Sequence, residues 1–180
     1  MPTMLDVQQA CEAGEFAAAR RLCAELARSG DAAAMQQLGH WHAAGDAGCQ
    51  RDPGLAAYWY FQAWQAGLDA VEQDIIRVRA ELEAAAENGS AEAQNALGLL
   101  LCFGHDDPFT AAIWFERAAE QNHPEALRTL GYLAEGGRGV PKDEARALDC
   151  LRRAAELGDP VAQVNLGMMP ASIPSNDSIS

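Results

Sequence analysis

The sequence predicts an all-α fold, an α-solenoid assembled from antiparallel helix-turn-helix repeats. The dipeptide Leu-Gly occurs four times, at residues 38–39, 97–98, 130–131 and 166–167. Each pair lies in a short Ala-rich segment, and the first three are followed by a second Ala-rich segment with aromatic or aliphatic residues. Self-similarity at a nearly fixed period is typical of repeat arrays. Such arrays form extended binding surfaces, and each unit contacts only its neighbours.

Start and stop signals divide the chain into helix pairs. Asp52-Pro53, for example, combines a capping residue with Pro at the first helical position. The expected divisions are a capping helix pair at 1–30, repeat 1 at 31–67, an insertion at 68–89, repeat 2 at 90–122, repeat 3 at 123–158, a partial repeat at 159–169 and a disordered tail at 170–180. Repeat 3 shows the unit most clearly, as a helix over 124–135, a loop over 136–141 and a helix over 143–157.

The motif of repeat 3 resembles a known repeat. Its elements are Leu130-Gly131, Gly137-x-Gly139-Val140, Asp143, Ala147 and Ala154-Ala155-Glu156-x-Gly158. This pattern is similar to the Sel-one-like repeat (SLR), a relative of the tetratricopeptide repeat, and the resemblance covers residues 31–67 and 90–167. It implies a right-handed superhelix of antiparallel helix pairs. It also implies an adaptor or scaffold role, which bacterial members often play in signalling, secretion or envelope processes.

The insertion departs from the repeat. The first two Leu-Gly pairs are 59 residues apart, whereas 33 and 36 residues separate the later ones. The extra segment, 68–88, contains neither Gly nor Pro, and its apolar residues follow helical spacing: Val71, Ile75, Val78, Leu82 and Ala85. We expect one long helix, which would reverse the direction of the following pairs. The alternative is a hairpin whose first helix is stunted, with a turn near Asp74.

The chain also departs from the repeat at its C-terminal end. Residues 159–169 begin a helix like the first helix of a repeat, but Pro170 stops it. We expect this helix to close the stack with its apolar side. The alternative is an adhesive patch at Met168 and Met169, because Met is an adaptable contact residue. A monomer is the expected state, and a homodimer through this half-repeat is the alternative.

Composition restricts the possible partners. The chain has 180 residues, with 13 basic and 26 acidic side chains and a formal net charge of −13. This balance argues against nucleic acid and anionic membranes, which require basic patches, and it suits a basic partner. No apolar stretch reaches the roughly 20 residues of a membrane helix. The start lacks the features of a secretory signal, so we expect a cytoplasmic protein, or a periplasmic one if a leader was removed.

The sequence gives no support for catalysis, a cofactor or a metal site. It contains no Gly-x-Ser-x-Gly elbow and no phosphate-binding loop. His40 and His42 are two residues apart, which places them on different helix faces. The group Cys102, His105, Asp106 and Asp107 matches no structural zinc spacing. The five cysteines are expected to be reduced, with one bridge, Cys11–Cys23, left as an alternative.

Two surfaces are candidates for binding a partner. The first comes from the tetratricopeptide-like resemblance, which places the concave face on the first helix of each repeat. The residues at those positions are Gln36, His40, Glu92, Asn95, Leu99, Glu125, Arg128, Tyr132 and Glu135. The second is an aromatic cluster on the second helix of repeat 1, formed by Tyr58, Phe61 and Trp64. Either the insertion packs on this cluster, which we expect, or the cluster is an exposed interface hot spot.

These observations favour a non-catalytic module that binds another protein or peptide on its concave face. A groove with amide, aromatic and acidic groups suits an extended or helical peptide. One alternative is an immunity-type inhibitor of a secreted effector, which the small size and acidity of the chain suggest. The other is a small hydrolase.

Overall fold

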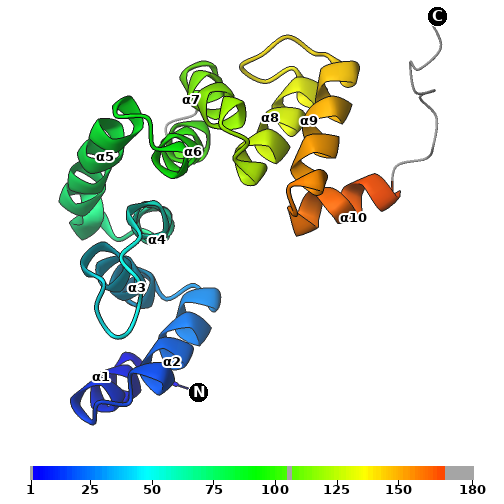
Figure 1. Cartoon of the computed structure of the whole chain (residues 1–180). Coiled ribbons are helices and arrows are strands. Elements are labelled where there is room, and N and C mark those ends of the chain that lie inside the picture. Colours follow the sequence, from blue (N-terminus) through cyan, green and yellow to red (C-terminus); the bar gives the residue numbers. More distant parts are fainter. Residues whose placement is uncertain (1, 105–106, 169–180) are drawn as a thin grey trace, which may run out of the picture.

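Short α-helices follow one another along a curved path (Figure 1). Longer loops join α3 to α4 and α8 to α9. The computed structural model describes residues 2–104 and 107–168, and these contain no strand. The helices are α1 (Met4–Glu12), α2 (Phe16–Arg28), α3 (Ala32–Ala44), α4 (Pro53–Gln65), α5 (Glu72–Glu87), α6 (Ala91–Leu99), α7 (Pro108–Glu120), α8 (Pro124–Gly136), α9 (Glu144–Glu156) and α10 (Pro160–Met168). A 3₁₀ turn (Asp69–Val71) precedes α5, and a π-helical turn (Leu100–Gly104) follows α6.

Side-chain caps set the starts of the helices. The carboxylates of Asp31, Asp52 and Asp143 accept hydrogen bonds from backbone N–H groups three residues ahead, and the Ser90 hydroxyl does the same. Such caps satisfy donors that a helix leaves without an internal partner. At the other end, Gly45 after α3 and Gly137 after α8 adopt the left-handed conformation that glycine tolerates. The boundaries are therefore encoded locally.

The Leu-Gly pairs explain how the two helices of a repeat come together. A Cβ atom built on Gly39 would lie 2.5 Å from the ring of Tyr60, and one built on Gly131 would lie 3.0 Å from Cγ of Leu151. Tyr60 and Leu151 are fully buried. Glycine on the first helix therefore makes room for a large buried side chain of the second helix. The neighbouring Leu38, Leu97 and Leu130 are buried in the same core.

The insertion contains one α-helix, α5, and its apolar stripe faces the core. Val71, Val78 and Leu82 are buried, and Ile75 and Ala85 pack against the core from partly buried positions. No turn interrupts the helix near Asp74, because α5 is continuous from Glu72 to Glu87. The chain therefore has an odd helix between two sets of pairs.

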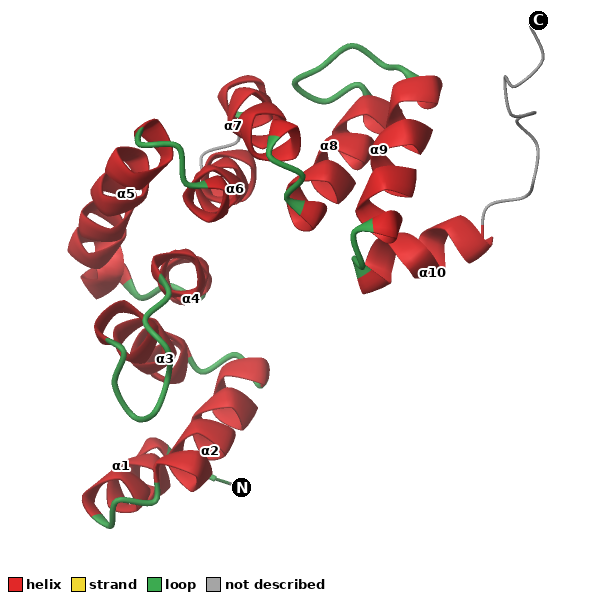
Figure 2. Cartoon of the chain, viewed as in Figure 1, coloured by secondary structure: helices red, strands yellow, loops and turns green. Residues whose placement is uncertain are grey.

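The odd helix changes which helix lines the inside of the arc. α5 packs against both α4 and α6, and α4 also contacts α6 directly. In Figures 1 and 2, α4 and α6 lie along the inner side of the arc, whereas α5 and α7 lie along its outer side. α4 is the second helix of repeat 1, yet it lies on the same inner side as α6, the first helix of repeat 2. The aromatic face of α4 is consequently brought beside α6.

The C-terminal helix α10 packs on α9. Its N-terminal part is anchored by Ala162, which is fully buried, whereas Val161 and Val164 are exposed. The expected tail at 170–180, Met169 and the side chain of Met168 lie outside the described residues, as do His105 and Asp106.

Candidate functional site

A groove of about 1010 Å³ runs between α4, α5 and α6 and reaches the start of α8. Its base is narrow because the two inner helices meet there: a Cβ atom on Gly54 would lie 2.9 Å from the Cβ of Ala96. The small, buried residues Ala57 and Ala93 also line the groove. The walls carry larger side chains from α4 on one side and from α6 on the other.

The groove unites residues from both sequence-predicted surfaces. Six of the twelve predicted residues line it: Tyr58, Phe61, Glu92, Asn95, Leu99 and Glu125. The other six lie outside it: Gln36, His40, Trp64, Arg128, Tyr132 and Glu135. The two predicted surfaces are thus partly one surface, and the helix repeats alone did not indicate that they would meet.

The expectation that the insertion covers the aromatic cluster was wrong for two of its members. Tyr58 is 51% exposed and Trp64 is 46% exposed. Trp64 stacks on Phe61, with ring centroids 5.8 Å apart. The buried face of α4 is instead built from Ala56, Ala57, Tyr60 and Ala63, against which the neighbouring helices pack. The aromatic face is left open toward the groove.

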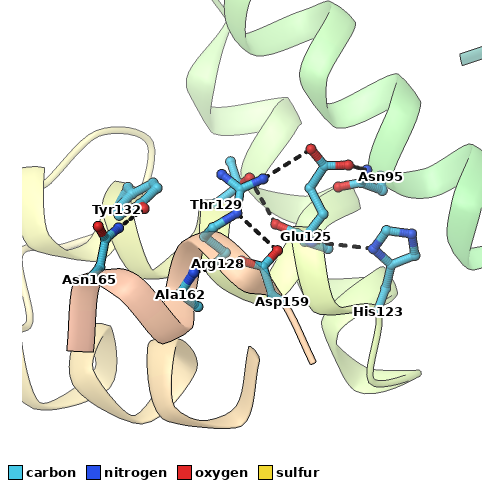
Figure 3. A network of polar contacts seen from close by, with 10 residues as sticks. Asn95, His123, Glu125, Arg128, Thr129, Tyr132, Asp159, Ala162 and Asn165 are labelled. Atoms are coloured by element: carbon cyan, nitrogen blue, oxygen red, sulfur yellow. Dashed lines mark hydrogen bonds and ion pairs between the residues drawn. The ribbon is translucent and has the colours of Figure 1, made fainter. Parts of the chain in front are cut away.

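Several predicted residues on the first helices of the repeats belong to a polar network between repeats (Figure 3). Nδ2 of Asn95 donates to Oε2 of Glu125 at 2.9 Å, and Nη2 of Arg128 donates to Oε1 of the same carboxylate at 3.0 Å. Nε of Arg128 donates to Oδ2 of Asp159 at 3.1 Å. The Asp159 side chain is only 8% exposed. Arg128 is therefore a structural residue that binds Asp159 at the start of α10.

The same network continues from Tyr132 to Asn165, whose amide donates to the Tyr132 hydroxyl (Figure 3). Asp159 has a second role, since its Oδ1 accepts from the backbone N–H of Ala162 at 2.7 Å and caps α10. Sequence reasoning did not include Asp159, although the Asp-Pro pair at 159–160 repeats the helix-start signal of Asp52-Pro53. Its pairing with Arg128 joins residues 31 positions apart and has no local signal.

His40 also bonds across the stack. Its Nε2 lies 3.3 Å from Oδ2 of Asp74 on α5, and its ring packs edge-on against Tyr60 at 5.5 Å. Asp74 in turn accepts from Arg77 at 2.6 Å. His40 thus connects α3 to the inserted helix α5. Asp74, near which the alternative interpretation placed a turn, lies within α5 and forms this contact.

The charges along the groove are mostly acidic. Four carboxylates line it, those of Asp52, Glu81, Glu92 and Glu125, together with the guanidinium of Arg51. Arg51 is bonded to Glu81, and Asp52 caps α4. Within the described residues, Glu92 makes no ion pair, and it is exposed. Arg51 and Glu81 were not among the predicted residues, because their contact joins a loop of repeat 1 to α5.

The polar groups that resemble catalytic ones are used to cap helices. Ser90, which lines the groove, accepts from the backbone N–H of Ala93 through its hydroxyl at 3.2 Å. His123 accepts from the N–H of Ala126 through Nδ1 at 3.3 Å. Across the described ranges, no group of three or more His, Cys, Asp or Glu side chains is arranged to hold a metal ion. The site offers apolar contact, hydrogen bonding and negative charge.

Comparison with known proteins identifies the repeat. The family model of the Sel1 repeat matches residues 32–68, 91–123 and 124–159. The chain belongs to the Sel1 repeat family. Sel1 repeat proteins are generally protein-interaction and scaffold modules. The matched ranges leave out the first helix pair, the whole of the inserted helix α5, and α10.

Relatives of this Sel1 repeat protein include larger proteins. It is 28% identical over 153 residues to the chitin synthase regulator SKT5 of Malassezia restricta, covering 82% of this chain and 9% of the relative. Among solved structures, it is similar to a protective antigen of uropathogenic Escherichia coli that displays an SLR fold, with 29% identity and a TM-score of 0.50 over 83% of this chain and 36% of that one. A Sel1 repeat protein from Oxalobacter formigenes is 28% identical, with a TM-score of 0.48, covering 82% of this chain and 96% of the other. No helix among residues 2–104 and 107–168 is long and apolar enough to cross a bilayer.

Proposed function

We propose that this Sel1 repeat protein is a non-catalytic adaptor or regulatory module that binds a partner protein or peptide in the groove between α4 and α6. One observation carries the proposal: the exposed aromatic face of α4 and the predicted partner-binding face of α6 line the same groove. Tyr58 supplies an exposed aromatic ring, Leu99 an apolar side chain and Glu92 a free charge. Aromatic anchors beside polar groups are the composition of protein-binding hot spots.

The rest of the molecule supports binding over chemistry. The Ser90 hydroxyl and the His123 imidazole, which both line the groove, each accept a backbone hydrogen bond as a helix cap. Family membership points in the same direction, and the relative named a chitin synthase regulator supports a role that acts on another protein. A module of this kind works by placing one protein next to another or by covering part of its surface.

The test compares variants inside and outside the groove. Leu99→Arg places a charge in the groove wall, whereas Trp64→Arg places the same charge on an exposed aromatic position of α4 that does not line it. Tagged wild-type and variant proteins are used to capture partners from lysate of the source organism, followed by mass spectrometry and by binding measurements with the purified partner. We expect Leu99→Arg to weaken binding at least about tenfold and Trp64→Arg to leave it within about twofold.

Circular dichroism of both variants ensures that the helices are intact. Equal binding by wild type and Leu99→Arg would show that the groove is not the binding surface. Loss of binding with Trp64→Arg alone would show that the partner binds the exposed surface of α4 around Trp64 and not the groove.

A further inference from the structure

We infer that the groove binds a short, extended segment of its partner in which a Lys or Arg side chain lies close to an apolar side chain. This inference rests on the proposed function and specifies the chemistry of the ligand. It follows from the charge that remains free in the groove, from the apolar surface beside that charge, and from the distance between them.

The free charge in the groove is that of Glu92. The other carboxylates have partners: Glu81 pairs with Arg51, Glu125 accepts from both Asn95 and Arg128, and Asp52 accepts from the backbone N–H of Leu55 as the cap of α4. Glu92 is exposed and has no ion pair among the residues that the structure describes. A carboxylate in a groove with low-dielectric walls attracts a cation more strongly than one on an open surface. The formal charge of −13 on the whole chain steers a basic segment in the same direction.

The apolar surface in the groove is formed by Tyr58, Phe61 and Leu99. Tyr58 and Phe61 are three residues apart on α4, and Glu92 and Leu99 are seven residues apart on α6, so each pair lies on one helix face. Phe61 is partly buried, and its ring stacks on that of Trp64. An apolar side chain of the partner can enter between the two helices, with its neighbouring cation at Glu92.

The spacing on α6 determines the length of the segment. Seven residues of α-helix rise about 10 Å, at 1.5 Å per residue. An extended chain covers that distance with about three residues, at roughly 3.3 Å each. Side chains of an extended segment alternate in direction, so a cation and an apolar group on the same side are two residues apart. Two residues cover about 7 Å, and the long side chain of Lys or Arg covers the rest of the distance to Glu92. The favoured pattern is therefore a basic residue, any residue, then a large apolar residue, in either order.

An array of immobilised synthetic peptides tests the pattern. The peptides carry Lys, Arg, Gln or Glu two positions from Leu, Phe or Ser in an otherwise Gly-Ser sequence, and the fluorescently labelled full chain is the probe. We expect binding to be confined to peptides with both a basic and an apolar residue and to decrease as salt is added. Glu92→Arg should weaken it at least about tenfold.

Glu135→Arg is the matched control. Glu135 is also an exposed acid on the first helix of a repeat, but it lies outside the groove, and its replacement changes the net charge by the same amount. We expect it to weaken binding by less than about twofold. An equal loss in the two variants would show that only the overall charge matters, and it would overturn the inference.

Three further results would overturn it. Equal binding of Glu- and Lys-containing peptides would show that charge does not determine binding. An array in which no peptide is bound would show that the groove does not bind a short segment of this kind. Self-association in light scattering that Leu99→Arg abolishes would assign the groove to a second copy of the chain. If captured partners still depend on Leu99 while the peptides show no charge preference, the proposed function stands and this inference alone fails.

Discussion

A Cβ atom on Gly98 would lie 2.7 Å from Cε1 of Phe115, closer than real Cβ contacts allow. Phe115 is fully buried, so its ring has no free space into which it can move. The Leu-Gly pair of repeat 2 is therefore a contact surface for α7, as Gly39 is for Tyr60 in repeat 1. This relationship explains why the dipeptide returns in each of the three complete repeats.

Gly98→Ala should destabilise the protein. Overpacking of a well-filled core costs about 1–3 kcal/mol, which exceeds the gain of roughly 1 kcal/mol from Ala in a helix. Thermal unfolding followed by circular dichroism measures the effect. Gly167→Ala is the control, because a Cβ atom on Gly167 would meet nothing within 4 Å. We expect that variant to unfold at the same temperature or slightly higher; a drop equal to that of Gly98→Ala would contradict the packing explanation.

Leu82→Ala should show that α5 is an integral part of the core. Leu82 is 3% exposed, and truncating a buried Leu costs about 2–5 kcal/mol. Ile76→Ala on the same helix is the comparison, since Ile76 is 53% exposed. We expect the second substitution to change the free energy of unfolding by less than about 0.5 kcal/mol. Denaturant titration of both variants gives the values, and similar midpoints would mean that α5 is not packed as described.

Arg128→Met should destabilise the C-terminal end of the stack. The change keeps most of the side-chain volume but leaves the buried Asp159 carboxylate without its guanidinium, a loss of about 1.5–3 kcal/mol for a hydrogen bond to a charged group. Arg79→Met removes the ion pair with Glu83, in which both side chains are far more exposed. Exposed pairs of this kind contribute about 0.3–0.5 kcal/mol. Hydrogen exchange should show faster opening of α10 in the first variant only, and equal exchange would contradict the network.

Cys23 should make the protein less stable in alkali. Burial, with a smaller contribution from Asp31, raises the pKa of the Cys23 thiol from its ordinary value of 9.0 to about 12. Below pH 9 both the folded and the unfolded chain hold the proton, and the contribution to stability is complete. Between pH 9 and about 12 only the folded chain still holds it, so stability falls as the pH rises, by about 1.4 kcal/mol per pH unit at most.

Urea unfolding across that pH window measures this fall, and Cys23→Ala should reduce its slope. The reactivity of the thiols gives an independent check in native protein. Cys11 and Cys49 are partly exposed, whereas Cys23, Cys102 and Cys150 are buried. Two thiols should therefore react quickly with a disulfide reagent. Rapid reaction of Cys23 would show that its site opens easily, and a slope unchanged in Cys23→Ala would assign the alkaline loss to other groups.

Most of the fold could be predicted from the sequence because its signals are local. Asp52, Ser90 and Asp143 cap helices within three residues of themselves. The spacing of Val78, Leu82 and Ala86 places one face of α5 in the core. The repeats themselves follow from the Leu-Gly pairs. The exposure of the aromatic cluster could not be predicted in this way. It depends on which neighbouring helix covers the face of α4 that carries Tyr58, and no residue within α4 determines that.

The sequence by itself determined the helices, their boundaries and their pairing through the Leu-Gly contacts, since each depends on residues within one repeat. The tertiary structure decided where a partner could bind. The single helix α5 takes the outer position behind α4, so the face that carries Tyr58 opens beside Glu92 and Leu99, which lie more than thirty residues further along the chain. Such a juxtaposition depends on how successive helices turn against one another, and it has no signature in the spacing of residues along any one of them.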